Sequence, residues 1–142
     1  MTTERRKLRW NGWGLAHASF DLGSRDAEVW AYIAAALGRD KLVPHPAVPL
    51  PDIHIPATRL ADDSLGALQD VVGSEHLKTD RFERAFHARG KSYLDLLAVR
   101  AGELGEQVPD AVVYPGDAEE VQGVVELALT RDLARVPFGG GF

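Results

Sequence analysis

Three consecutive glycines near the C-terminal end give this sequence its clearest chemical signal. Gly139, Gly140 and Gly141 directly follow a short apolar run, residues 134–138. Glycine allows positive φ angles and close approach of another group to the backbone, and successive exposed N–H groups can form an anion-binding nest. The functional interpretation is a cradle for phosphate or pyrophosphate. The alternative is a terminal tail that binds nothing, and the glycines alone favour that alternative, since the chain ends before a dinucleotide-binding G-x-G-x-x-G pattern is completed.

The other polar side chains give weaker signals. Arg89, Lys91 and Arg100 lie in a basic helix–turn–helix segment and could contact a phosphate, although charged helix faces are usually only solvated. No pair of the five histidines has metal-ligand spacing; they are His17, His45, His54, His76 and His87. Cysteine is absent, which excludes disulfides, thiolate metal sites and a cysteine nucleophile. We therefore predict no metal site.

Two tryptophans lie close together near the N-terminus. Trp10 and Trp13 flank Asn11-Gly12, which is a turn signal. One interpretation is an anchor packed on a larger body. The other is stacking on a base or sugar, aided by nearby arginines. The net charge of −5 argues against a general binder of nucleic acid or anionic membranes, so we favour the anchor.

The elements around the glycines are predicted by local signals. Residues 111–114 form an apolar, β-branched run closed by Pro115-Gly116, which predicts a strand and a turn. Asp117 is the expected N-cap of a helix, with Glu120 as its capping-box partner. One face of this helix is apolar, and it comprises Val121, Val124, Val125, Ala128 and Leu129. Residues 134–138 are expected to form a second strand, giving a right-handed parallel βαβ unit.

The preceding part of the chain is predicted to be mainly helical. We expect a first helix over residues 24–37, capped by Ser24, and a proline-rich extended run over residues 43–57. The buried face of the first helix is expected to comprise Val29, Trp30, Ile33, Ala34 and Leu37. Shorter helices should follow, over residues 64–72, from a start at Thr79 or Asp80 to before Gly90, and over residues 93–100 with Ser92 as the cap. The expected fold class is therefore α+β, with a helical N-terminal region followed by one βαβ unit.

The composition is that of an ordinary globular protein. Apolar residues make up 45% and charged residues 26% of the 142 residues. No apolar run approaches the roughly 20 residues that span a bilayer. The basic N-terminal stretch is not followed by the apolar core of a signal peptide. We therefore expect a cytoplasmic protein without a transmembrane segment.

Several motifs together resemble those of one protein family. Pro-Asp-Ala-Val-Val-Tyr-Pro, Ala-Glu-Glu-Val and Val-Pro-Phe-Gly-Gly-Gly, in that order, resemble the start of the FAD-binding domain in vanillyl-alcohol-oxidase-like flavoproteins, the FAD-binding oxidase/transferase type 4 family. Arg-Trp-Asn-Gly-Trp-Gly and Gly-Lys-Ser-Tyr resemble motifs of one branch, the alkyldihydroxyacetonephosphate synthases and their bacterial relatives. Because the motifs occur in the same order over nearly the whole chain, they are more specific together than any one of them.

The resemblance implies a cofactor site. In this family the glycine loop after the second strand holds the FAD pyrophosphate, which implies a cofactor-binding role for Pro137, Phe138, Gly139, Gly140 and Gly141. The family's usual continuation is Thr-Ser-Val, whereas Phe142 stands here in place of the threonine. The synthases exchange the acyl chain of acyl-dihydroxyacetone phosphate for a fatty alcohol to make an ether lipid precursor, and bacterial relatives include flavin oxidases of 2-hydroxy acids. Their catalytic residues lie in later domains, so we assign none to this chain.

The resemblance also implies a division of the chain. We expect residues 1–105 to form the N-terminal helical region, and residues 106–142 the incomplete first subdomain of an FAD-binding domain. The favoured hypothesis is an N-terminal fragment of such a flavoprotein, inactive alone and with weak or absent FAD binding until the missing C-terminal part is supplied. The alternatives are a split subunit that completes its flavin site with a complementing partner, and a non-catalytic interaction module.

Overall fold

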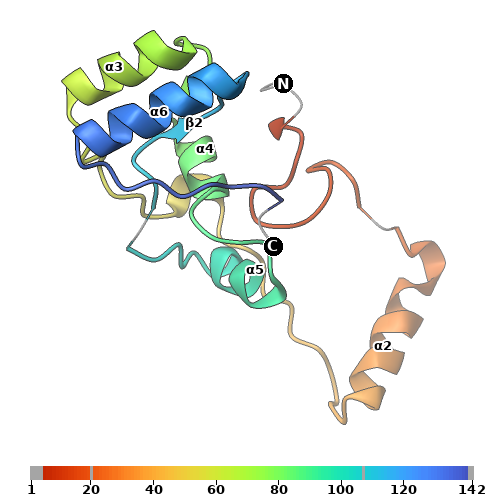
Figure 1. Ribbon diagram of the computed structural model, residues 1–142. Helices are drawn as coiled ribbons and strands as arrows, with labels where there is room; N and C mark the ends of the chain where they lie inside the picture. Colours follow the sequence, from red (N-terminus) through yellow and green to blue (C-terminus); the bar gives the residue numbers. More distant parts are fainter. Residues whose placement is uncertain (1–4, 20, 107, 141–142) are drawn as a thin grey trace.

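The structure is a computed structural model of the chain, and it describes residues 5–19, 21–106 and 108–140 (Figure 1). Gly141 and Phe142 lie outside the described residues. The helices and strands are η1 (Gly23–Arg25), α2 (Asp26–Ala36), η2 (Leu50–Asp52), α3 (Asp62–Val72), β1 (Leu77–Lys78), α4 (Arg81–Phe86), α5 (Tyr93–Arg100), β2 (Val112–Val113) and α6 (Ala118–Thr130). None of the helices in the described part of the chain is long and apolar enough to cross a membrane.

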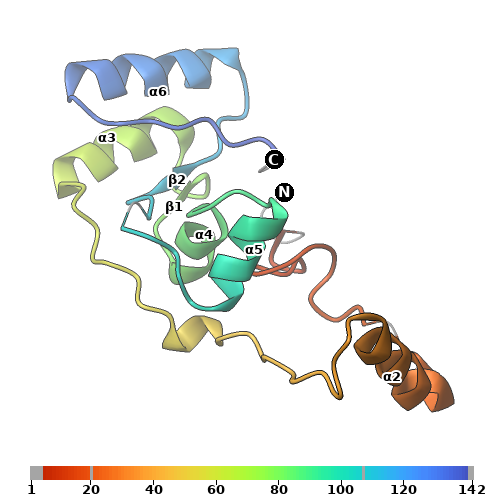
Figure 2. The ribbon, with the colours of Figure 1, turned by 90° about the horizontal axis from the view of Figure 1, so that it is seen from below.

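Helices α3 and α6 lie side by side over the small sheet, as both ribbon views show (Figures 1 and 2). The sheet pairs β1 with β2 in antiparallel orientation, with Leu77 opposite Val113. The core between these elements is apolar, and it comprises Leu68, Val72 and Leu77 with Leu60, Leu65, Val71, Ala111, Val113, Val124 and Leu127 around them. The two helices approach closely at Gly123 of α6, where an added Cβ would lie only 2.9 Å from Val71 Cγ1 of α3.

Three helices begin at the caps that the sequence predicts. The Asp117 carboxylate accepts the Glu120 N–H at 2.9 Å, and Glu120 in return accepts the Gly116 N–H at 2.7 Å. Ser92 Oγ accepts the Asp95 N–H at the start of α5. Asp80, one of the two residues predicted to start the next helix, caps α4 by accepting the Phe82 and Glu83 N–H groups. These side chains satisfy backbone donors that have no partner inside a helix.

The proline-rich run is extended apart from the short η2 helix, as expected from its prolines. It is nevertheless part of a second core, because Ile53 is 3% exposed and packs among residues of α4, α5 and the loop after α5. This core comprises Ile53, Ala85, Val99, Leu104 and Val108, with Trp10, Val48, Leu50, Ile55 and Ala88 packed against it. The Val48 N–H donates to the Arg100 carbonyl and fixes the run against the end of α5.

Helix α2 lies apart from the rest of the molecule in both views (Figures 1 and 2). Its existence is as predicted, but two details are wrong. Ser24 lies in η1 instead of capping α2, whose N-cap Arg25 makes no side-chain cap. The predicted buried face is also only partly covered: Trp30 and Leu37 are 50% and 64% exposed, Val29 and Ile33 are half-buried, and Ala34 is buried. An apolar pattern predicts a helix without specifying the element that covers it.

The predicted parallel βαβ unit is not formed. Residues 134–138 contain no strand, and β2 pairs with the earlier strand β1, antiparallel, instead of with this segment. The physical reason is the lack of a neighbour, because parallel strands are stable mainly within larger sheets covered on both faces. Since β1 and α3 pack against β2 and α6, the expected regions 1–105 and 106–142 share one core. Their description as two domains stays a prediction.

Candidate functional site

A cleft of about 140 Å³ lies where three of the sequence motifs meet. It is lined by Leu8, Arg9, Gly12, Trp13, Gly14, Phe86, Lys91 and Gly140. The segment after α6 crosses the body and ends beside the N-terminal loop, as the two ribbon views agree (Figures 1 and 2). The cleft therefore brings together the Trp-Asn-Gly-Trp-Gly motif, the Gly-Lys-Ser-Tyr motif and the glycine loop.

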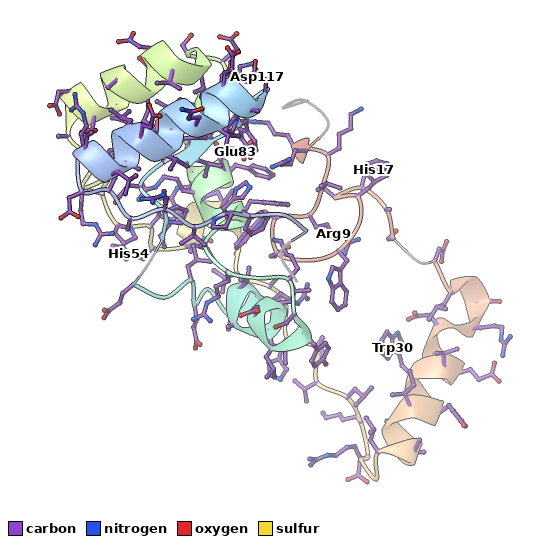
Figure 3. All side chains as sticks on the ribbon, viewed as in Figure 1. Arg9, His17, Trp30, His54, Glu83 and Asp117 are labelled. Atoms are coloured by element: carbon purple, nitrogen blue, oxygen red, sulfur yellow. The ribbon has the colours of Figure 1, made fainter. Side chains whose placement is uncertain are left out.

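The N-terminal wall of the cleft is a short hairpin-like loop. Leu8 and Leu15 form an isolated antiparallel bridge, and the Arg9 N–H donates to the Gly14 carbonyl at 2.9 Å. The Arg9 guanidinium donates to the Leu15 and Ala18 carbonyls on the same loop, and Figure 3 shows it beside the body. Backbone and side chain together hold this loop closed around its predicted Asn-Gly turn.

The two tryptophans of this loop have different surroundings. Trp10 packs against the second core, as predicted for an anchor. Trp13 is 59% exposed, and its indole N–H donates to the Lys91 carbonyl at 3.1 Å. That hydrogen bond fixes the edge of the ring while the rest stays accessible at the cleft.

Among the described residues, two cations line the cleft: Arg9, whose guanidinium is hydrogen-bonded to carbonyls of its own loop, and Lys91, which is buried. The Lys91 Nζ donates to the Trp10 carbonyl at 3.0 Å and lies 4.0 Å from the centroid of the Phe86 ring. The loss of hydration lowers the pKa of Lys91 from 10.5 to about 8. The segment's other predicted phosphate contacts lie elsewhere: Arg89 faces Asp95 at 3.8 Å, and Arg100 is exposed.

The glycine loop is held in place by the aromatic residue before it. The Phe138 ring lies edge-on to His87, with centroids 4.6 Å apart, and 6.5 Å from the Phe86 ring. Pro137 is exposed, and Gly140 lines the cleft. A Cβ added to Gly139 would meet no atom within 4 Å, so the backbone there faces open space. This room for a ligand is what the predicted cofactor role of residues 137–141 requires, although that role stays a prediction.

A buried polar network lies behind Phe138. Glu83 of α4, labelled in Figure 3, is fully buried, and its Oε2 accepts a hydrogen bond from the Tyr114 hydroxyl at 2.6 Å. Arg5 donates to the Tyr114 hydroxyl at 2.8 Å and lies 3.3 Å from His87 Nε2. Glu83 Oε1 has no partner among the described residues. The network thus joins the N-terminal segment, α4 and the end of β2.

The hydrogen bonds assign a neutral tautomer to His87. Its Nδ1 lies 2.7 Å from the Glu83 backbone carbonyl, which only accepts, so Nδ1 carries the proton. Nε2 is then the acceptor that faces the Arg5 guanidinium. Burial is the main cause that lowers the pKa of His87, and burial together with the Glu83 carboxylate raises the pKa of Tyr114.

Sequence reasoning missed this network. The missed signal is the i, i+4 spacing of Glu83 and His87 on one helix, followed by a tyrosine at a strand end. In the part of the chain that the structure describes, no group of three or more potential metal ligands lies together. The absence of a metal site stays a prediction.

No protein-family model matches the chain. It is similar to curated alkyldihydroxyacetonephosphate synthases. The match to the synthase of Dictyostelium discoideum is 33% identical over 96 residues and covers 68% of this chain and 16% of that protein. The match to the synthase of Trypanosoma brucei brucei is 36% identical over 74 residues and covers 52% of this chain and 12% of that protein. It is also 29% identical over 110 residues to Protein Rv2250A of Mycobacterium tuberculosis (strain ATCC 25618 / H37Rv), covering 77% of this chain and 70% of that protein.

The fold gives the same result. A solved structure of an alkyldihydroxyacetonephosphate synthase matches 97% of this chain with a TM-score of 0.82 and 25% identity, and the match covers 29% of that chain. The chain thus spans less than a third of the synthases it matches. The resemblance of its motifs is confirmed: the chain is homologous, in sequence and in fold, to part of the alkyldihydroxyacetonephosphate synthases.

Proposed function

We propose that this chain supplies the first part of an FAD site in a synthase-like flavoprotein, with residues 137–141 holding the FAD pyrophosphate. The observation that carries the proposal is the environment of the glycine loop. Phe138 is fixed by its ring contacts, whereas Gly139 faces open space and Gly140 lines a cleft. The space beside Gly139 and Gly140 leaves room for a group from outside the chain to lie close to the backbone there.

The residues present fit a pyrophosphate. The loop offers backbone N–H groups, and a buried lysine faces the same cleft. FAD, when bound, supplies the redox chemistry, and this chain binds and orients its phosphates. The missing parts of the flavin site lie in the region of the synthases that the chain does not cover. We therefore propose that the chain alone has no turnover and binds FAD weakly or not at all.

The second candidate is a split subunit that completes a flavin site with a separately encoded partner. The observation that favours it is the match to Protein Rv2250A over 70% of that protein's length, in contrast to 16% for the Dictyostelium discoideum synthase. A protein largely made of this region is therefore among the curated relatives. Both candidates assign the same role to the glycine loop and differ only in the source of the remainder.

The test is complementation. The chain is co-expressed with the part of the Dictyostelium discoideum synthase that follows the matched region, and the purified material is measured for bound flavin by visible absorbance. We expect about one flavin per complex and none on the chain alone. The variant Gly139→Ala should still co-purify but lose flavin. Stoichiometric flavin on the isolated chain contradicts the inactive-alone proposal, and a flavin-free complex contradicts the role of the loop.

A further inference from the structure

The charge of Lys91 is the feature that the proposed function leaves unexplained. The residue is 7% exposed, and none of the ion pairs among the described residues includes it. Its described contacts are one backbone carbonyl and one aromatic face. Burial of an ammonium is costly unless a counter-charge compensates it. Among the described residues, Lys91 is thus a desolvated cation in the cleft without a carboxylate partner.

The cleft brings this cation to the same site as the glycine loop. Lys91 and Gly140 line the same cleft, and Trp13, fixed by its hydrogen bond to the Lys91 carbonyl, lines another wall. An ammonium has three N–H donors, and the Trp10 carbonyl accepts one of them. Donors therefore remain for a ligand that enters beside the glycines.

We propose that Lys91 is a phosphate-binding residue, the cationic half of a site whose other half is the glycine loop. Phosphate is the ligand class that suits both halves, because it accepts hydrogen bonds from backbone N–H groups and from an ammonium at once. The proposal rests on the proposed function in that the loop is an anion site. It adds a residue outside residues 137–141, in a segment about 50 positions earlier in the sequence. The phosphate belongs either to a dinucleotide pyrophosphate or to a phosphorylated substrate.

The experiment titrates the ¹⁵N-labelled chain with inorganic pyrophosphate and follows the backbone amides by NMR. We expect saturable shifts at Gly139, Gly140 and Lys91 in the wild type. Lys91→Met should weaken binding by at least about tenfold, the loss of one charge-assisted hydrogen bond. Lys41→Met, at an exposed lysine, should leave the affinity unchanged. Wild-type chain that does not bind, or Lys91→Met that binds as tightly as wild type, overturns the proposal.

Two further measurements use the wild-type chain, so that a folding defect in a variant cannot affect them. The first tests the charge of Lys91, and the second asks which kind of molecule carries the bound phosphate. In the wild type, ADP affinity should fall as the pH rises above about 8, because Lys91 loses its charge there while ADP keeps its own. A flat profile overturns the proposal without any variant. ADP and glycerol 3-phosphate compared at neutral pH distinguish a dinucleotide pyrophosphate from a phosphomonoester, and riboflavin is the phosphate-free control.

The same measurements separate this proposal from the proposed function. If Gly139→Ala binds pyrophosphate normally and Lys91→Met does not, Lys91 is confirmed and the loop assignment fails. If Gly139→Ala alone loses binding, the loop stands and Lys91 is overturned. Retention of FAD in the complemented assembly is read separately, because it also depends on the rest of the flavin site.

Discussion

Two polar clusters lie within one short segment, residues 83–91, and they are built in opposite ways. Glu83 and His87 belong to a network in which Tyr114 and Arg5 supply hydrogen bonds from distant segments. Lys91, four residues later, has one carbonyl partner and faces a cleft. The first cluster draws its partners from the chain itself, although Glu83 Oε1 has none among the described residues. The second faces a cleft, and no described carboxylate pairs with its charge.

The difference distinguishes polar groups that stabilise the fold from a polar group that is available to bind a ligand. A buried network with satisfied donors fixes the relative positions of the segments that contribute to it. A desolvated cation without a counter-ion opposes folding, so its presence is explained by a ligand more readily than by stability. Removal of a network group should therefore destabilise the chain, and removal of the cleft cation should not.

The largest expected effect is at the centre of the network. Tyr114→Phe removes the hydroxyl that donates to Glu83 and accepts from Arg5, and leaves a fully buried carboxylate without its strongest hydrogen bond. We expect a loss of about 2–3 kcal/mol in the free energy of unfolding, measured by urea denaturation. The same change at exposed Tyr93 is the control, with an expected effect below about 0.5 kcal/mol. Equal effects at both positions would show that the network does not stabilise the fold.

The next effect has the opposite sign. Lys91→Met should raise the free energy of unfolding at pH 7 by about 1 kcal/mol, because relief of desolvation exceeds the loss of one hydrogen bond. The folded-state pKa of about 8 lies below the unfolded value of 10.5, so the unfolded state binds more protons between them and wild-type stability rises with pH there. The advantage of the variant should thus shrink from pH 8 to pH 10. A variant that is less stable at every pH would contradict the comparison.

A smaller effect follows from His87. Its folded-state pKa lies below the unfolded value of 6.5, so its contribution to stability is complete above that pH and is lost as the pH falls towards the folded-state pKa. We expect His87→Gln to reduce the dependence of the urea midpoint on pH below 6.5. The variant His45→Gln, at an exposed imidazole, is expected to keep the wild-type dependence. An unchanged profile in His87→Gln would exclude the imidazole as the titrating group.

The sequence was sufficient for the locally determined features. The caps at Asp117, Ser92 and Asp80 were predicted because capping depends on residues within one turn. The glycine loop and the Gly-Lys-Ser-Tyr segment were also identified as candidate phosphate contacts, and the structure brings Gly140 and Lys91 to one cleft.

The features that were missed depend on distant partners. Glu83 would be expected on a solvated face, and the hydrogen bond that its buried carboxylate accepts comes from Tyr114, 31 residues away. The strand predicted at residues 134–138 failed for the related reason that a strand requires a neighbour. Helix α2 shows the same limit, because its helical form was predicted correctly but no element in the described part of the chain covers its apolar face.

The smallest expected effect on stability is at the loop itself. Gly139→Ala should change the free energy of unfolding by less than about 0.5 kcal/mol, because the added methyl group meets no atom within 4 Å and φ is not in the left-handed region. Gly123→Ala is the matched change at a packed position, where the new Cβ would lie 2.9 Å from Val71 Cγ1, and it should cost about 1–2 kcal/mol despite the higher helix propensity of alanine. Urea denaturation measures both.

In the binding assay the expected effects of the two alanine variants are reversed. Gly139→Ala should lose pyrophosphate affinity, whereas Gly123→Ala should keep it, since α6 packs on α3 away from the cleft. A Gly139→Ala chain that is destabilised as much as Gly123→Ala would mean that the glycine serves the fold. A stable Gly139→Ala chain with impaired binding would place the requirement for glycine on the ligand, which is the distinction between the closed network and the open cleft.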